Sequence, residues 1–402
     1  MNNERLYIKH FGPIIETEVL FNKVTVFIGE QGSGKSTVAK LFSLFSWLEK
    51  ALVRRILTEK YVIQYARFKK NFCAFNGLTE YFYNDTVIQY DGIHYSFTYQ
   101  DDKLFVEEIP LGSNLYHISK VMYVPAERAI IGSVDHAGSL KGVNDALRTF
   151  IEEYENAKRQ QKSGYDIPFG NVKFKYDQLN DIPRLVHSDY DIRLSVASSG
   201  YQSSLPLLLV SKNLTNMVGN SKENAGLSAK EMNSLRKEVE TIMQMEDVSE
   251  DVRKASLQTL TSRYSYTGFI NVVEEMELNL YPDSQKTVLY ELIQDAMQQS
   301  GNKLVLTTHS PYVINYLTLA VKAKQVSQRS EGSEIFSRLN VIVPAASQLD
   351  PSDLTIYEMS GGVARLLANY EGLPSDDNYL NEKLNDSNSM FDALLEIEEE
   401  IG

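Results

Sequence analysis

The segment Gly29–Thr37 has the spacing G-x-x-x-x-G-K-[ST] and follows the apolar run Val24–Ile28. In such a loop between a buried strand and a helix, glycines let successive backbone N–H groups turn toward a phosphate. Lys35 would reach the β- and γ-phosphates, and the Ser36 hydroxyl would complete the shell of a Mg2+ ion. The loop therefore predicts a nucleoside triphosphate site made by Gly29, Glu30, Gln31, Gly32, Ser33, Gly34, Lys35, Ser36 and Thr37.

Two successive carboxylates follow a second apolar run, Gly268–Val273. At the end of a strand, neighbouring side chains point to opposite sides. We therefore assign Glu274 to the Mg2+ ion and Glu275 to orienting or deprotonating the attacking water. Taken alone, the pair could equally be an exposed acidic strand end, but the phosphate loop in the same chain favours the catalytic interpretation.

A third apolar run, Lys303–Thr308, stops at His309. A single histidine is usually structural or exposed, but a neutral imidazole at a strand end can hydrogen-bond a γ-phosphate and respond to its loss. Because this histidine follows the acidic strand in the chain, we expect it to lie at the phosphate.

Small residues precede an apolar helical stretch in the segment Leu194–Gln202. Ser198, Ser199 and Gly200 at the start of a helix would offer free N–H groups to an anion. By itself this pattern is an ordinary helix cap. Its place in the chain between the phosphate loop and the acidic strand favours a further phosphate contact.

These motifs need a fold that brings several strand ends together. A short apolar run at 121–124 predicts another core strand, and Asp91-Gly92 between alternating segments predicts a β-hairpin. We expect helices over 37–72, 144–162 and parts of 221–262, and short antiparallel strands between residues 77 and 120.

The composition excludes several classes of protein. The 402 residues are 43% hydrophobic and 23% charged, which is typical of soluble globular domains. No apolar run approaches the roughly 18 residues of a membrane span, and the N-terminus has no secretory pattern. One cysteine, Cys73, cannot form an internal disulfide. We therefore expect a cytoplasmic protein that does not enter a membrane.

The formal net charge of −13 argues against a surface that binds polyanions throughout. One stretch, residues 54–72, nevertheless combines basic and aromatic side chains and could contact nucleic acid. The alternative, which we favour, is a solvated helix face over an aromatic core stripe.

Taken together and in this order, the four motifs resemble those of ABC-type ATPases, in the RecF- and SMC-like branch of soluble ATPases. The resemblance implies an α/β P-loop NTPase head with an antiparallel β subdomain and an inserted helical subdomain, which binds ATP with Mg2+. It assigns the Walker A motif to Gly29–Thr37, the signature motif to Ala197–Gln202, the Walker B motif to Ile270–Glu275, the D-loop to Glu277–Asn279 and the switch histidine to His309.

Three departures from the family pattern stand out. Glu274 replaces the usual Walker B aspartate, and its extra methylene predicts slow hydrolysis. Ser199 and Tyr201 depart from the Leu-Ser-Gly-Gly-Gln form of the signature motif. In addition, no glutamine lies at the strand end before Pro125–Arg128, where the family has its Q-loop. The residue that links the nucleotide to the rest of the fold therefore stays open.

The resemblance covers residues 1 to about 320 and implies a domain organisation. We expect an ATPase head over 1–320, with the β lobe at 77–120 and helical insertions at 140–180 and 211–265. Residues 321–402 are expected to form a C-terminal extension with strands and a terminal helix.

A closer resemblance is to ATPases of bacterial anti-phage and genome-maintenance systems, related to the overcoming-lysogenisation-defect family, because the segment Glu274–Pro282 is similar to theirs. Relatives often carry a nuclease domain after the switch histidine, and we expect none here. The resemblance therefore implies a separate, nuclease-like effector protein.

In this family two chains enclose two ATP molecules, and the signature motif of one chain completes the site of the other. This implies a homodimer or higher homo-oligomer that hydrolyses ATP and acts as a switch in anti-phage defence. Two alternatives stay open at this point: a RecF-like repair ATPase that binds DNA directly, and a scaffold that hydrolyses little.

Overall fold

A computed structural model describes residues 4–110, 117–219, 229–244, 249–330 and 332–401. Its centre is a six-stranded sheet with the order β15-β14-β3-β13-β12-β7, in which β15 is antiparallel to β14 and the other pairs are parallel. The strands are β3 (Val24–Gly29), β7 (Ser119–Val124), β12 (Gly268–Glu274), β13 (Lys303–Thr307), β14 (Leu354–Ser360) and β15 (Val363–Leu366).

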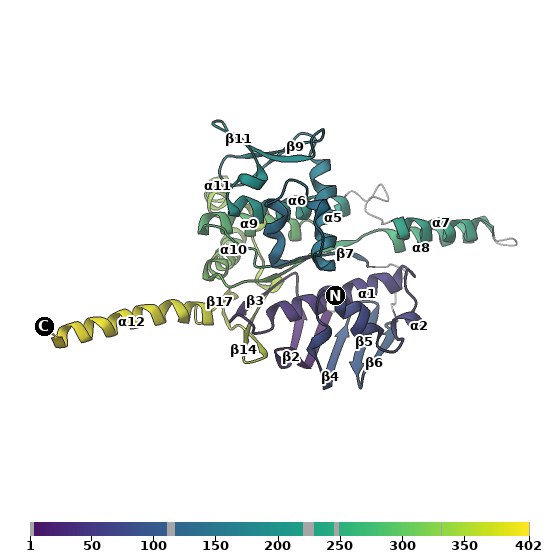
Figure 1. Ribbon diagram of the computed structural model, residues 1–402, viewed down its shortest axis with the longest axis horizontal. Coiled ribbons are helices and arrows are strands. Elements are labelled where there is room, and N and C mark those ends of the chain that lie inside the picture. The colour runs from purple at the N-terminus through teal and green to yellow at the C-terminus, as the bar shows by residue number, and fades with distance from the viewer. Residues whose placement is uncertain (1–3, 111–116, 220–228, 245–248, 331, 402) are drawn as a thin grey trace.

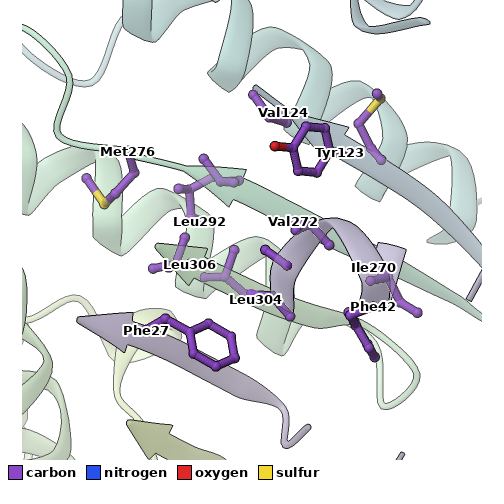
Figure 2. Packing of buried hydrophobic residues seen from close by; sticks show 14 of the residues in the cluster. Phe27, Phe42, Tyr123, Val124, Ile270, Val272, Met276, Leu292, Leu304 and Leu306 are labelled. Carbon is purple, nitrogen blue, oxygen red and sulfur yellow. The ribbon is translucent and has the colours of Figure 1, made fainter. Parts of the chain in front are cut away.

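Strands β3 and β12 are buried along their whole length, because helices cover both faces of a parallel sheet. Figure 2 shows Phe27, Val272 and Leu304 among the buried side chains of three neighbouring strands. The helices that contact the sheet are α1 (Lys35–Val53), α5 (Asp145–Gln160), α6 (Ser199–Gly219), α9 (Pro282–Met297) and the start of α12 (Tyr379–Ile401), and α10 (Pro311–Arg329) packs on α9. This agrees with the α/β fold predicted from the sequence.

A second, antiparallel sheet has the order β2-β1-β4-β5-β6 and lies beside α1 (Figure 1). Its strands are β1 (Glu4–Phe11), β2 (Ile14–Phe21), β4 (Phe82–Asp91), β5 (Tyr95–Gln100) and β6 (Lys103–Glu108). The sheet therefore includes the N-terminal strands, which the predicted lobe at 77–120 does not. The tight two-residue turn lies at Asp101–Asp102, where both residues have positive φ, and the loop after Asp91 is longer.

The helix predicted over 37–72 ends much earlier, at Val53. Arg55 has a left-handed φ of 55°, and short pieces follow: α2 (Glu59–Val62), a π-helix (Phe68–Phe72) and α3 (Cys73–Phe75). Next to this break, Arg54 is fully buried and pairs with Glu231 at 2.6 Å. The end of α1 is thereby fixed to the base of a helical hairpin.

That hairpin, α7 (Ala229–Met243) and α8 (Glu250–Tyr264), projects from the body in Figure 1. It falls within the predicted insertion at 211–265, of which residues 220–228 and 245–248 lie outside the described part of the chain. Residues 211–219 are the end of α6, so the hairpin alone is the inserted element. In the described residues, no helix combines the length and apolar character needed to cross a bilayer.

The region predicted as a helical insertion at 140–180 is helical only in α5. A small antiparallel sheet follows, formed by β8 (Tyr165–Asp166), β9 (Lys173–Asp177), β10 (Ile182–Val186) and β11 (Asp191–Arg193). Alternating polar and apolar residues in β9 and a turn at Asp181, whose φ is 56°, account for strands here.

The C-terminal part also differs from the predicted boundary at residue 320. Strand β14 pairs in parallel with β3, so the central sheet of the head is completed by residues well beyond 320. The rest of this part contains α11 (Ser333–Ile342), β16 (Asn369–Tyr370), β17 (Leu373–Pro374) and the terminal helix α12 (Tyr379–Ile401). In Figure 1, α12 extends away from the body.

Several short helices complete the structure: α4 (Ala129–Gly132) and the 3-10 turns Thr79–Tyr81, Ala126–Arg128, Ala137–Ser139, Leu194–Val196, Ala345–Ser347 and Pro351–Asp353.

The contact between β3 and β14 requires a residue without a Cβ atom at position 29, and this can be tested. This residue has φ 135°, and a Cβ atom there would lie 2.1 Å from the carbonyl oxygen of Met359. We expect Gly29→Ala to lower the free energy of unfolding by more than about 3 kcal/mol in urea titrations. Gly77→Ala is the control, because Gly77 also has positive φ but open space, and it should lose only about 1–2 kcal/mol. Equal losses would contradict the β3–β14 contact.

Candidate nucleotide-binding site

The phosphate loop leaves β3 at Gly29 and enters α1 at Lys35. Gly32 and Gly34 have φ of 76° and 102°, values that glycine adopts without strain. The loop's outer side is open, since Gln31 and Gly32 are exposed and Ser36, in the first turn of α1, is half-buried. The first turn of a helix presents unpaired N–H groups, so the loop and helix together form an anion site.

Lys35 lies folded over this loop. Its Nζ donates hydrogen bonds to the carbonyl oxygens of Gly29 at 2.9 Å and Glu30 at 2.6 Å, and the residue is only 5% exposed. Burial lowers the pKa of Lys35 to about 8, although the charges of Glu275 and Glu277 act to raise it. A phosphate oxygen in the loop would give this ammonium a charged acceptor and stabilise its protonated form.

The two carboxylates at the end of β12 have different surroundings. Glu274 is 5% exposed, and its Oε1 has no hydrogen-bond partner in the described part of the chain. Its Oε2 accepts a long hydrogen bond, 3.4 Å, from the backbone N–H of Ala126. Glu275 is only partly buried and has a left-handed φ of 44°. One carboxylate is thus buried with a free acceptor, and the next faces the open side.

Two further residues of the site come from β13 and the loop after it. His309 Nε2 lies 3.9 Å from Oε1 of Glu275, and both side chains are about a third exposed. Burial, and then the charge of Lys35, lower the pKa of His309, so its imidazole is neutral at neutral pH. Its backbone N–H donates to Oε1 of Glu277 at 2.7 Å, which fixes the loop that carries it.

The predicted signature segment starts α6. Ser198 and Ser199 are exposed, and Gln202 donates to the carbonyl oxygens of Ser195 at 2.9 Å and Ala197 at 3.1 Å, which holds the preceding loop in place. Within the described residues, no hydrogen bond or ion pair joins Ser198–Gly200 to the phosphate loop of the same chain. The structure therefore brings together Lys35, Glu274, Glu275 and His309, whereas the exposed signature segment makes no hydrogen bond or ion pair to these side chains in the described residues.

Arg128 is part of the surroundings of this site but was not assigned a role from the sequence. Its guanidinium is fully buried and donates to the carbonyl oxygens of Glu274 and Glu275, each at 2.6 Å. The nearest sequence signal is its position just after the core strand β7, but nothing local indicates that an arginine in Pro-Ala-Glu-Arg is buried. Tyr123 of β7 is also buried, and burial followed by the charge of Glu274 raises the pKa of its phenol.

Part of the basic and aromatic stretch after α1 is used within the fold, while Arg55, Lys60, Tyr65 and Lys70 are exposed. Arg54 is buried in its pair with Glu231, and Arg67 stacks 3.7 Å above the ring of Tyr61. Phe68 is 2% exposed and belongs to the core. This placement fits the favoured interpretation, a solvated face over an aromatic stripe.

No cluster of three or more His, Cys, Asp or Glu side chains that could hold a metal ion occurs in the described residues. Any cation at this site would therefore be held jointly by a few protein oxygens and by phosphates, which is the usual arrangement for Mg2+.

Residues 270–315 match a family model described as "AAA domain, putative AbiEii toxin, Type IV TA system". Comparison with curated proteins gave no match. Among solved structures, the chain is similar to the SMC head domain from Thermotoga maritima, with 12% identity, coverage of 92% of this chain and 100% of that chain, and a TM-score of 0.37.

A second similar structure is the recombination mediator protein RecF with ATP, with 12% identity, coverage of 91% of this chain and 98% of that chain, and a TM-score of 0.30. At these TM-scores and identities, the structural similarities carry no conclusion about activity or partners. The segment matched by the family model contains Glu274, Glu275 and His309. Together with the phosphate loop and the parallel strand order, this match supports an ATP-binding, AAA-type P-loop domain.

The lowered pKa of Lys35 predicts a pH dependence of nucleotide binding. The charged ammonium is the form that pairs with phosphate, so binding takes up a proton once the pH exceeds the free-protein pKa of about 8. We expect the dissociation constant of a fluorescent ATP analogue to rise about tenfold from pH 7 to pH 9. His309 does not titrate in this window, because its pKa is lowered from 6.5.

Lys35→Met is the control for this titration. It should bind more weakly at every pH and lose most of the slope, since the titrating group is gone. An unchanged slope in Lys35→Met would assign the pH dependence to another group and contradict the prediction.

Proposed function

We propose that this chain is an ATP-hydrolysing switch that dimerises around ATP and controls a partner effector in bacterial anti-phage defence. The observation that carries the proposal is an exposed signature segment that is not bonded to the phosphate loop of its own chain in the described residues. Lys35, Glu275 and His309 lie together, whereas Ser198 and Ser199 are exposed on the start of α6 and make no hydrogen bond to the phosphate loop of their own chain in the described residues. A second copy would supply the missing half.

The donor atoms at the strand end fit a Mg2+ ion. Glu274 has a buried carboxylate oxygen without a hydrogen-bond partner in the described chain, and Ser36 offers its hydroxyl from the first turn of α1. When bound, Mg2+ would neutralise charge between the β- and γ-phosphates. We assign these two residues as its protein ligands.

Each remaining residue has a role that follows from its surroundings. Glu275, which is partly exposed, orients a water molecule and accepts its proton. Lys35 supplies positive charge to the phosphates, and neutral His309 donates a hydrogen bond to the γ-phosphate. Ser198–Gly200 of the second copy contribute helix N–H groups to the same phosphate. Loss of that phosphate removes the group that both copies share, and the dimer loosens.

The C-terminal helix α12 supports a separate effector. Its large apolar residues are exposed, for example Phe391 at 60% and Leu394 at 62%. They recur at helical spacing on one face, together with Leu384, Leu395, Ile397 and Ile401. An unpartnered apolar stripe of this size marks a protein contact.

Charge indicates the kind of partner that this helix fits. Helix α12 carries seven acidic residues against one basic residue, Lys383: Glu382, Asp386, Asp392, Glu396, Glu398, Glu399 and Glu400. Two copies of such a helix would repel one another, so self-pairing of α12 is disfavoured. We therefore propose that α12 docks in an apolar groove of the effector rimmed by Lys and Arg.

Mixing two inactive variants tests the shared site. Lys35→Ala removes the phosphate ligand of its own chain, and Ser198→Arg blocks the segment that it offers to its neighbour. In a mixed dimer, one site retains native Lys35 from one chain and native Ser198 from the other. We expect each variant alone to hydrolyse ATP at least tenfold more slowly, and the mixture to recover about a quarter of native activity.

A site built within one chain predicts no recovery on mixing, and that result would sink the proposal. Lys35→Ala mixed with Glu275→Gln is the matched control. Both changes damage the same half-site, so this mixture should stay inactive.

A change on the apolar stripe tests the effector contact. In cells that carry this gene with its native neighbours, we expect Leu394→Glu to reduce phage protection at least tenfold in plating assays, since a charge on the stripe opposes burial. The ATPase rate of the purified variant should stay native. Asn385→Glu is the control, because it adds the same charge on the polar face of α12.

Native protection by Leu394→Glu would show that α12 is not the effector surface. Absence of protection by the unaltered genes would reject the anti-phage role itself, and leave the ATP-dependent dimer to be judged by the mixing experiment.

A further inference from the structure

We propose that Arg128 is a positioning residue that holds the end of β12, with Glu275, and the start of α6, with the signature segment, in one fixed relation. The inference deepens the proposed function and rests on it. Because each composite site would use Glu275 from one chain and α6 from the other, Arg128 would serve both sites of a dimer at once.

The contacts of Arg128 reach three elements. Nη1 donates to the carbonyl oxygen of Glu274 and Nη2 to that of Glu275, both at 2.6 Å. Nε donates to the carbonyl oxygen of Ser203 in α6 at 3.1 Å, and Nη1 also reaches the carbonyl oxygen of Pro125 at 3.2 Å. The side chain is fully buried, so these four carbonyl groups replace solvent as its acceptors.

The planar guanidinium suits this position because it presents five N–H groups in a rigid fork. A lysine ammonium is a single point and cannot reach all of these carbonyl oxygens together. Burial lowers the pKa of Arg128 to about 10, while the charges of Glu277 and Glu275 act to raise it. The group therefore stays protonated at neutral pH and keeps all its donors.

The end of β12 needs such a support. Glu275 has φ 44°, a left-handed conformation that is strained for a residue with a Cβ atom. Its N–H is held by the carbonyl oxygen of Thr307 at 2.9 Å, and its own carbonyl by Arg128. With both flanking peptide groups fixed, the direction in which the Glu275 side chain leaves the backbone is fixed as well.

The start of α6 is tied to the same region by two other contacts. The Ser203 hydroxyl donates to the carbonyl oxygen of Leu278 at 2.7 Å, and a Cβ atom on Gly200 would lie 3.0 Å from the carbonyl oxygen of Asn279. Arg128 adds the link from α6 to the peptides on either side of Glu275. Asn271 of β12 also donates to the Ser211 hydroxyl of α6 at 2.9 Å, but this contact lies further back along both elements than Arg128 does.

The mixing experiment can separate the two effects of this residue. We expect Arg128→Met to bind a fluorescent ATP analogue within threefold of native affinity and to lower kcat at least tenfold. A mixture of Arg128→Met with Ser198→Arg should then stay inactive. In that mixed dimer, the site with the phosphate loop of the Ser198→Arg chain would use α6 from the Arg128→Met chain. A mixture of Arg128→Met with Lys35→Ala should also stay inactive. In that mixed dimer, the site would combine Glu275 of the Arg128→Met chain with α6 of the Lys35→Ala chain.

Recovery with Ser198→Arg would mean that Arg128 supports only its own Glu275, and recovery with Lys35→Ala that it supports only α6. Either result overturns the inference while leaving the shared site intact. If Lys35→Ala and Ser198→Arg do not recover activity with each other, the shared site itself is wrong and this inference falls with it.

Two further variants test whether the effect comes from losing any arginine or from failure to fold. Arg159→Met is the control for loss of an arginine, since Arg159 is exposed in a surface pair with Glu155, and it should keep native activity and complement both partners. If Arg128→Met does not fold, Arg128→Lys keeps the positive charge with fewer contacts. It should show the same failure to complement, and native behaviour of Arg128→Lys would contradict a role for the fork.

Discussion

The register of three parallel strands is the constraint on which the site depends. Thr307 of β13 lies opposite both Phe27 of β3 and Glu274 of β12, so β12 and β13 end at one level and β3 ends two residues further on, at Gly29. The ladder continues past these ends, because Thr308 donates to Phe27 at 3.0 Å and Glu275 donates to Thr307 at 2.9 Å. A slip of one residue would exchange the faces of the two acids and place the carboxylate of Glu275 in the core.

Charge imposes the second constraint. Lys35 and Arg128 are buried cations among the carboxylates of Glu274, Glu275 and Glu277, yet within the described residues both donate to backbone carbonyl oxygens and form no salt bridge. The negative charges of these acids thus stabilise the buried cations through space, although the carboxylates form no ion pair with them. Oε1 of Glu274 stays available for a cation, and the partly exposed carboxylate of Glu275 stays available for a water molecule.

The sequence was sufficient for the residues that meet at the strand ends, because each follows an apolar run recognisable on its own: Gly29, Glu274 and His309. Pairings between distant segments were not predictable in the same way. The strand β14 is readable as a strand, but nothing local indicates that it completes the sheet beside β3. The same holds for β1, which pairs with β4. Arg128 was missed since a polar Pro-Ala-Glu-Arg segment gives no sign of burial.

If two copies share their sites as proposed, the links within one chain also connect the two sites. The segment from Met276 to Asn279 lies between Glu275 and the start of α6, with Met276 in the core and Ser203 bonded to Leu278. Glu275 would act on the chain's own nucleotide, whereas α6 would reach the nucleotide of the neighbour. A shift at either end is passed through close contacts between backbone groups, which yield little. Hydrolysis in one site would therefore displace the signature segment that contributes to the other site. Both sites of the dimer would then open together.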